Sequence, residues 1–241
     1  MAEGIKDKVA IVGMGCTRFG ERWNASVVDL LIEAASEAYE DSGIGPKDIE
    51  LVYLSTCYPD LTGATGEIAS KALKLQRIPI IRVENACASG QDAIRNAAYA
   101  IAAGAADIAM AIGVEKLKDT GFSGLGSYFC TMGLIFGEAA ALPSATGPGL
   151  FAILATVYFN KYGLSLEEGK RLIGMASVKS HWSGARNSKA HFHNILTIDR
   201  VLNAPIIAWP LGLFDCCGVS DGSAAVILAR ADMANSFKQN P

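Results

Sequence analysis

Apolar residues in the first half of the chain fall into short unbroken runs separated by longer amphipathic stretches. The runs have the length of buried strands and lie at residues 9–13, 49–55, 78–83 and 107–114. Helical spacing or a high alanine content marks the stretches at 27–39, 66–75 and 89–103. A further apolar run at 223–229 predicts a fifth strand. Strands that alternate with helices predict an α/β fold with a mostly parallel sheet.

Capping signals mark the ends of two predicted helices. Ser26 is followed by Asp29, which is the spacing of a capping box, and Gly43 is suited to end the same helix. Ser165 and Glu168 repeat this spacing and predict the start of another helix.

The pattern changes after residue 118. Residues 120–149 are rich in glycine and proline, which predicts a loop-rich insertion rather than more sheet. A helix is expected at 150–162, and a polar, irregular stretch at 180–194. The sheet domain is therefore expected to begin at residues 1–118, to be interrupted by an insertion at 119–207, to resume with a return strand at 208–232, and to end in a linker at 233–241.

Composition narrows the class of protein. Of the 241 residues, 51% are apolar and 19% are charged, so we expect part of the surface to be buried against another domain or subunit. A net charge of −3 gives no basic excess for nucleic acid or an anionic membrane. Six irregularly spaced cysteines, no signal peptide and no membrane-spanning run fit a reducing, cytoplasmic location.

Gly13 and Gly15 follow the first predicted strand, where a dinucleotide-binding loop would begin. That motif needs a third glycine at position 18, which is Arg18 in this chain. A structural turn is the better interpretation of the two glycines.

Cys87 lies where the apolar run at 78–83 gives way to an alanine-rich helix. A helix start leaves backbone N–H groups unpaired and favours an anion, and a thiolate is the nucleophilic form of cysteine. Small neighbours, Ala88, Ser89 and Gly90, leave room for an acyl group. Free cysteine more often serves as packing, so position and context together make Cys87 the candidate nucleophile.

The segment NACASG at residues 85–90 resembles the nucleophile motif of the thiolase family, in particular its sterol-carrier-type and archaeal acetyl-CoA acetyltransferase branch. Further segments resemble that branch in the same order: VAIVG at 9–13 with TRFG at 17–20, GVEK at 113–116 and DCCGVSDGSAA at 215–225. The resemblance implies a thiolase-like fold, with this chain as its N-terminal half carrying a loop-domain insertion.

The same resemblance implies an acyl-CoA acyltransferase. Cys87 would take up the acyl group, which then passes to coenzyme A in thiolysis or to a second acetyl-CoA in condensation. Coenzyme A would be substrate and product, and no metal or other cofactor is implied. The alternatives are a ketoacyl synthase, a hydroxymethylglutaryl-CoA synthase, a retro-aldolase relative, which we expect to lack the cysteine, and a non-catalytic subunit.

Candidate coenzyme A contacts come from the insertion and the return segment. The resemblance brings Cys217 near the pantetheine arm, and Arg186 and Lys189 are basic groups suited to the nucleotide phosphates. Ordinary packing for Cys217 and a solvated face for the two basic residues are the alternatives. His191 and His193 share one side of an extended segment, but a third metal ligand is not evident, so zinc is not expected.

Thiolases also use a histidine in a Gly-His-Pro segment and a second cysteine, both from a C-terminal half. This chain has no Gly-His-Pro. It is expected to be a fragment of a two-half enzyme; one subunit of a split enzyme, completed by a second chain, and a degraded relative are the alternatives. A homo-oligomer, dimer or tetramer, is implied, with residues 78–83 as the dimer edge.

Overall fold

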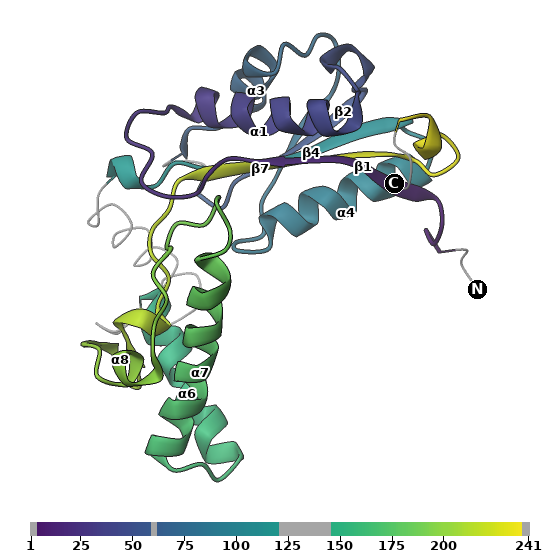
Figure 1. Ribbon diagram of the computed structural model, residues 1–241. Coiled ribbons are helices and arrows are strands. Elements are labelled where there is room, and N and C mark those ends of the chain that lie inside the picture. Colours follow the sequence, from purple (N-terminus) through teal and green to yellow (C-terminus); the bar gives the residue numbers. More distant parts are fainter. Residues whose placement is uncertain (1–3, 59–61, 121–145, 238–241) are drawn as a thin grey trace. The chain divides into compact units, whose positions relative to one another are not determined.

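The computed structural model describes residues 4–58, 62–120 and 146–237. Its contacts divide the chain into two compact units. The first comprises Met1–Asp119 together with Ser220–Pro241, and the second comprises Thr120–Val219. Figure 1 shows the elements of both units, coloured along the sequence.

The first unit is built on a five-stranded sheet with the order β1-β7-β4-β2-β3. β2 pairs in parallel with β3 and with β4, whereas β7 is antiparallel to both β1 and β4. Only β7 runs against the other four strands, which confirms a mostly parallel α/β sheet. The strands are β1 (Val9–Cys16), β2 (Leu51–Ser55), β3 (Ile80–Val83), β4 (Ile108–Glu115) and β7 (Gly222–Arg230).

Helices cover both faces of this sheet (Figure 1). α1 (Val27–Ser42) and α3 (Gly66–Ala72) lie on one face, and α4 (Ser89–Ala102) lies on the other. β4 alternates its side chains between the two layers, because successive strand residues point to opposite faces. Met110 and Ile112 pack with the α1 layer, and Ala109 and Ala111 with α4.

The caps expected for α1 are confirmed. Ser26 Oγ accepts a hydrogen bond from the Asp29 N–H at 3.2 Å, and the Ser26 N–H donates to Asp29 Oδ2 at 2.8 Å. Gly43 ends the helix with a φ of 72°, in the left-handed region that glycine adopts without strain. Local sequence alone therefore sets both ends of this helix.

Gly13 and Gly15 lie inside β1 rather than in a turn, which corrects the interpretation from sequence. A Cβ at Gly13 would come within 2.6 Å of the Ala38 carbonyl oxygen, and one at Gly15 within 2.3 Å of the Ala34 carbonyl oxygen. The two glycines thus let the backbone of α1 pack directly on β1. The cause is close packing of helix and strand, not binding of a dinucleotide.

The second unit is mainly helical. Ser165 forms the expected capping box with Glu168, and the helix that follows continues to Gly184. The prediction of irregular structure from residue 180 was therefore wrong for 180–184. The expected loop-rich segment falls largely on 121–145, outside the described residues. The elements are α6 (Gly147–Lys161), α7 (Leu166–Gly184), α8 (Ile198–Leu202), β5 (Ile206–Ala208) and β6 (Leu211–Gly212).

Residues 208–219 group with the second unit, whereas the return segment was expected to begin at 208. β5 and β6 pair with each other, not with the main sheet. Asp215 accepts hydrogen bonds from Ser177 Oγ at 2.8 Å and from the Gly212 N–H at 2.7 Å, and it pairs with Lys170. These contacts tie the segment to α7.

Four short 3-10 helices complete the described elements, η1 (Pro46–Asp48), η2 (Lys118–Thr120), η4 (Leu213–Asp215) and η5 (Ala234–Ser236). η5 lies in the stretch that was expected to be a linker. In the described part of the chain, no helix combines the length and the apolar character needed to cross a bilayer.

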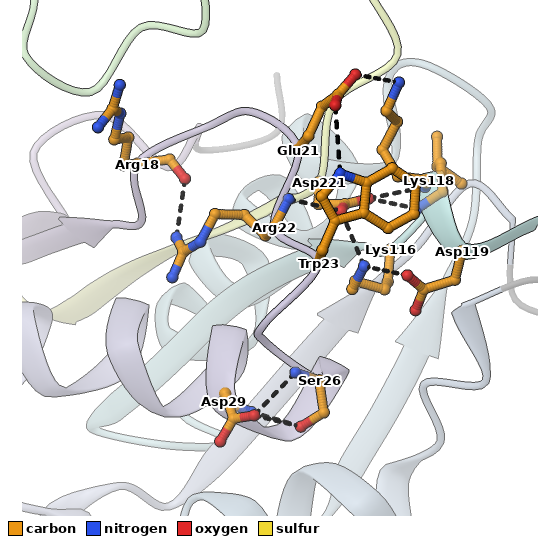
Figure 2. A network of polar contacts seen from close by, with 11 residues as sticks. Arg18, Glu21, Arg22, Trp23, Ser26, Asp29, Lys116, Lys118, Asp119 and Asp221 are labelled. Atoms are coloured by element: carbon orange, nitrogen blue, oxygen red, sulfur yellow. Dashed lines mark hydrogen bonds and ion pairs between the residues drawn. The ribbon is translucent and has the colours of Figure 1, made fainter. Parts of the chain in front are cut away.

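Asp221 is the polar centre of the first unit (Figure 2). Its side chain is 0% exposed, and its carboxylate accepts hydrogen bonds from the Leu117 N–H at 2.8 Å and the Lys118 N–H at 2.9 Å. The Arg22 N–H donates to it at 3.1 Å, and Lys116 Nζ lies 2.9 Å away. One carboxylate thus joins the loop after β1, the end of β4 and the start of β7.

This network holds the two points where the chain leaves and re-enters the sheet unit, at residues 119 and 220. Lys116 also pairs with the exposed Asp119 at 2.6 Å. The Nζ atoms of Lys116 and Lys118 lie 5.8 and 6.0 Å from the ring centroid of Trp23 (Figure 2).

Candidate functional site

Three parallel strands end side by side at one edge of the sheet. Ser55 of β2 is in register with Val83 of β3 and with Gly113 of β4. The residues that follow these strands are therefore neighbours, namely 56–58 after β2, 84–87 after β3, and Glu115 at the end of β4. In open α/β sheets, ligands bind outside the carboxyl ends of the strands.

Cys87 lies at this edge, between β3 and α4, as its sequence context predicted. Its thiol is free and exposed. The chain turns sharply before it, because Ala86 has a φ of 45°, a region that costs a non-glycine residue about 1–3 kcal/mol. Ala88 is the N-cap of α4, so the thiol is one residue outside the helix start.

Ser89 holds the strained turn in place. Its hydroxyl donates to the Ala86 carbonyl oxygen at 2.6 Å and accepts the Asn85 N–H at 2.9 Å. Asn85 Nδ2 also donates to Asp92 Oδ2 at 2.8 Å, which links the turn to the first turn of α4. Nothing lies within 4 Å of a Cβ built at Gly90, so the helix start beside Cys87 is open.

The segment after β2 borders the same edge. Glu115 accepts hydrogen bonds from the Thr56 hydroxyl at 3.1 Å, from the Cys57 N–H, and from the Thr62 hydroxyl at 2.7 Å. Burial raises the pKa of the Cys57 thiol to about 11, with further contributions from the charges of Glu115 and Cys87. Burial also raises the pKa of Tyr58, and Cys57 and Cys87 add to the increase. Both side chains are thus electrostatically coupled to Cys87.

Sequence reasoning did not identify Cys57, Tyr58 or Glu115 as part of this edge. The available signal was positional, because each follows or ends a predicted parallel strand, as Cys87 does. Glu115 was noted only as part of the segment at 113–116 that resembles thiolases.

The candidate coenzyme A residues all belong to the second unit, whereas Cys87 belongs to the first. Arg186 is exposed, and its guanidinium lies 3.5 Å from the ring centroid of Trp182. Lys189 is half-buried, and its N–H donates to Asn187 Oδ1 at 3.0 Å. Cys217 is exposed and follows η4.

Cys217 precedes Gly218, which lies close to the segment that carries His191 and His193. A Cβ at the next residue, Gly218, would lie 2.7 Å from the ring of Phe192, which itself stacks on His191 at 4.2 Å. Within the described ranges, no cluster of three or more His, Cys, Asp or Glu side chains is arranged to hold a metal ion.

Comparisons with known proteins agree with this geometry. The family described as thiolase, N-terminal domain, matches residues 9–124. An acetyl-CoA acetyltransferase of Methanocaldococcus jannaschii is 39% identical over 95% of this chain and 57% of its own length. One from Methanothermobacter thermautotrophicus is 36% identical over 97% of this chain and 60% of its own length. The chain therefore spans less than two thirds of each relative.

A solved structure shares the fold of this chain. A structure described as an Ltp2-ChsH2(DUF35) aldolase superposes with a TM-score of 0.78 and 24% identity, and the match covers 99% of this chain and 59% of that one. The family match and these relatives lead to one conclusion: residues 9–124 match the thiolase N-terminal domain, and the chain is similar to acetyl-CoA acetyltransferases over about three fifths of their length.

Proposed function

We propose that this chain carries the nucleophile of a thiolase-type acyl-CoA acyltransferase, and that Cys87 is that nucleophile. The observation that supports the proposal is the exposed thiol of Cys87 at the strand–turn–helix junction. The similarity to two archaeal acetyl-CoA acetyltransferases supports the reaction class.

In the first step, the Cys87 thiolate attacks the carbonyl carbon of an acyl-CoA thioester. A carbon–sulfur bond to Cys87 forms, the bond to coenzyme A breaks, and coenzyme A leaves as a thiolate that takes up a proton. The start of α4 favours the negative charge, because the helix dipole is positive there.

In the second step, the acyl group leaves Cys87 for an acceptor. In thiolysis, the Cys87 thiolate instead attacks the 3-keto carbon of a 3-ketoacyl-CoA, the bond between C2 and C3 breaks, and the acetyl-CoA carbanion leaves and takes up a proton; coenzyme A then accepts the acyl group from Cys87 as a shortened acyl-CoA. The carbanion of a second acetyl-CoA, formed by loss of a methyl proton, gives a new carbon–carbon bond, which is the condensation direction. In both cases the Cys87 thiolate is regenerated.

Two further assignments rest on the same resemblance. Arg186 and Lys189 would bind the nucleotide phosphates of coenzyme A, with Cys217 near the pantetheine arm. A second copy of the chain would pair along β3, which is an edge strand whose Ile81 is 43% exposed. The likeness to an aldolase concerns the fold alone, and an exposed thiol favours acyl transfer.

The first test is exchange of label between coenzyme A and acetyl-CoA, which needs only formation and reversal of the acyl-cysteine. We expect the purified chain to move labelled coenzyme A into the acetyl-CoA pool. Cys87→Ala should abolish the exchange, and Cys16→Ala, which removes a half-buried thiol at the end of β1, should retain it. Exchange by folded Cys87→Ala protein at the wild-type rate would refute the assignment.

A further inference from the structure

Glu115 lies at the same edge of the sheet as Cys87, although the two residues belong to different segments of the chain. It ends β4, and it collects three hydrogen bonds from the segment after β2. Oε1 accepts from the Thr56 hydroxyl and the Cys57 N–H, and Oε2 accepts from the Thr62 hydroxyl. An ionised carboxylate has only acceptor sites, and its two oxygens can accept all three hydrogen bonds.

Two of the three donors, the hydroxyls of Thr56 and Thr62, belong to buried residues. Thr56 is 2% exposed and Thr62 is 5% exposed. A buried hydroxyl or backbone N–H without a partner destabilises the arrangement that buries it. Glu115 therefore stabilises the placement of Thr56, Cys57 and Thr62 against the end of β4.

That segment leaves the sheet beside the turn that carries Cys87. Ser55, the last residue of β2, is in register with Val83, the last residue of β3, so the chains that follow emerge side by side. Cys57 and Tyr58 follow β2, and Cys87 follows β3 in the turn before α4. We call Thr56, Cys57 and Tyr58 the wall beside Cys87. The position of this wall depends on the hydrogen bonds that Glu115 accepts.

We propose that Glu115 is a positioning residue for Cys87: by anchoring Thr56, Cys57 and Thr62, it fixes the wall that the acyl group meets when it reaches the thiol. This inference rests on the proposed function for its catalytic consequence, but the anchoring itself does not. The group acts through hydrogen-bond geometry, not through its charge.

Replacing Glu115 by glutamine separates the role of its hydrogen bonds from the role of its charge. In Glu115→Gln, the amide oxygen can accept from the Thr56 hydroxyl and the Cys57 N–H, and the amide N–H₂ can donate to the Thr62 hydroxyl, which accepts as well as donates. Glu115→Ala removes all three partners. A positioning role predicts that Gln preserves function and Ala does not.

Glu50 offers a matched control at the opposite edge of the same strands. Its carboxylate accepts the Asp107 N–H at 2.6 Å, which also joins the β2 and β4 segments, but at their amino ends. Glu50→Ala removes a similar cross-strand bond and leaves the Cys87 edge untouched.

The experiment measures two quantities in the full chain and its variants: alkylation of Cys57 and Cys87 by iodoacetamide, followed by peptide mass, and label exchange between coenzyme A and acetyl-CoA. In wild type, Cys57 should react far more slowly than the exposed Cys87. Glu115→Ala should speed alkylation of Cys57 at least tenfold and slow exchange about a hundredfold, the loss typical of a misplaced reacting group. Glu115→Gln and Glu50→Ala should stay within about threefold of wild type on both measures.

Each other outcome counts against the inference in a distinct way. Unchanged Cys57 alkylation in folded Glu115→Ala protein would show that the carboxylate does not anchor the segment. Equal losses in the Gln and Ala variants would show that charge, not position, matters. If wild type shows no exchange, the proposed function fails, and the Cys57 alkylation rates still decide whether Glu115 anchors the wall.

Discussion

At the scale of single residues, Asp221 is a buried charge that accepts hydrogen bonds from several parts of the chain. It accepts hydrogen bonds from three backbone N–H groups, and its partner Lys116 is also buried, with 4% of its side chain exposed. A charge removed from such a pair leaves the other buried without compensation. The two residues therefore make a stronger contribution than the surface ion pairs of the same unit.

Asp221→Asn should lower the free energy of unfolding by about 3–5 kcal/mol. Asp119→Asn is the matched control, because Asp119 pairs with the same Lys116 at 2.6 Å but is 57% exposed, and its loss should change stability by less than about 1 kcal/mol. Urea unfolding followed by circular dichroism measures both variants. Equal, small losses would contradict a central role for Asp221.

The pH dependence of this contribution has a defined sign. Burial alone would raise the pKa of Asp221, but hydrogen bonds from Lys118, Lys116 and Arg22 outweigh burial and hold the pKa below its ordinary value of 3.8. A carboxyl with a lowered pKa in the folded state stabilises it above the unfolded pKa, and this stabilisation is lost as pH falls through the folded pKa.

The difference in unfolding free energy between wild type and Asp221→Asn should therefore be constant from pH 7 to about 5 and shrink below pH 3.8. Urea titrations of both proteins at several pH values measure it. A difference that grows as the pH falls would show that the pKa is raised instead.

At the scale of elements, the sequence predicts what depends on local chemistry. The capping box at Ser26 and the left-handed Gly43 set the ends of α1, and the apolar runs locate the strands to within a few residues. The role of Gly13 and Gly15 was not predictable, because it depends on the backbone of α1, which is distant in sequence.

Gly15→Ala tests this packing. The added methyl would lie 2.3 Å from the Ala34 carbonyl oxygen and 2.5 Å from the Ala38 nitrogen, so α1 must shift, and overpacking of this kind costs about 1–3 kcal/mol. At Gly45 the nearest atom would be 3.6 Å away, and Gly45→Ala should change stability by less than about 0.5 kcal/mol. Thermal unfolding compares the two. Equal stabilities would mean that β1 and α1 are not closely packed.

At the scale of the whole molecule, the mostly parallel sheet and the position of Cys87 at a strand–helix turn follow from the order of apolar runs. The neighbours of Cys87 do not. Glu115, Cys57 and Tyr58 lie at the same edge as Cys87 because β4, β2 and β3 are adjacent in the sheet, and local periodicity does not determine strand order. The extent of the second unit was also missed, since Asp215 ties residues 208–219 to α7 through contacts far apart in sequence.

The role of Cys87 is tested most directly by the intact mass of the chain after incubation with acetyl-CoA and rapid acid quenching. We expect one added acetyl group on wild type, located on the peptide that contains Cys87, and no addition on Cys87→Ala. Cys16→Ala, which removes a thiol of β1, should gain the acetyl group as wild type does. An acetyl group on another residue, or none on folded wild-type protein, would contradict the assignment of Cys87 as the acyl-accepting nucleophile.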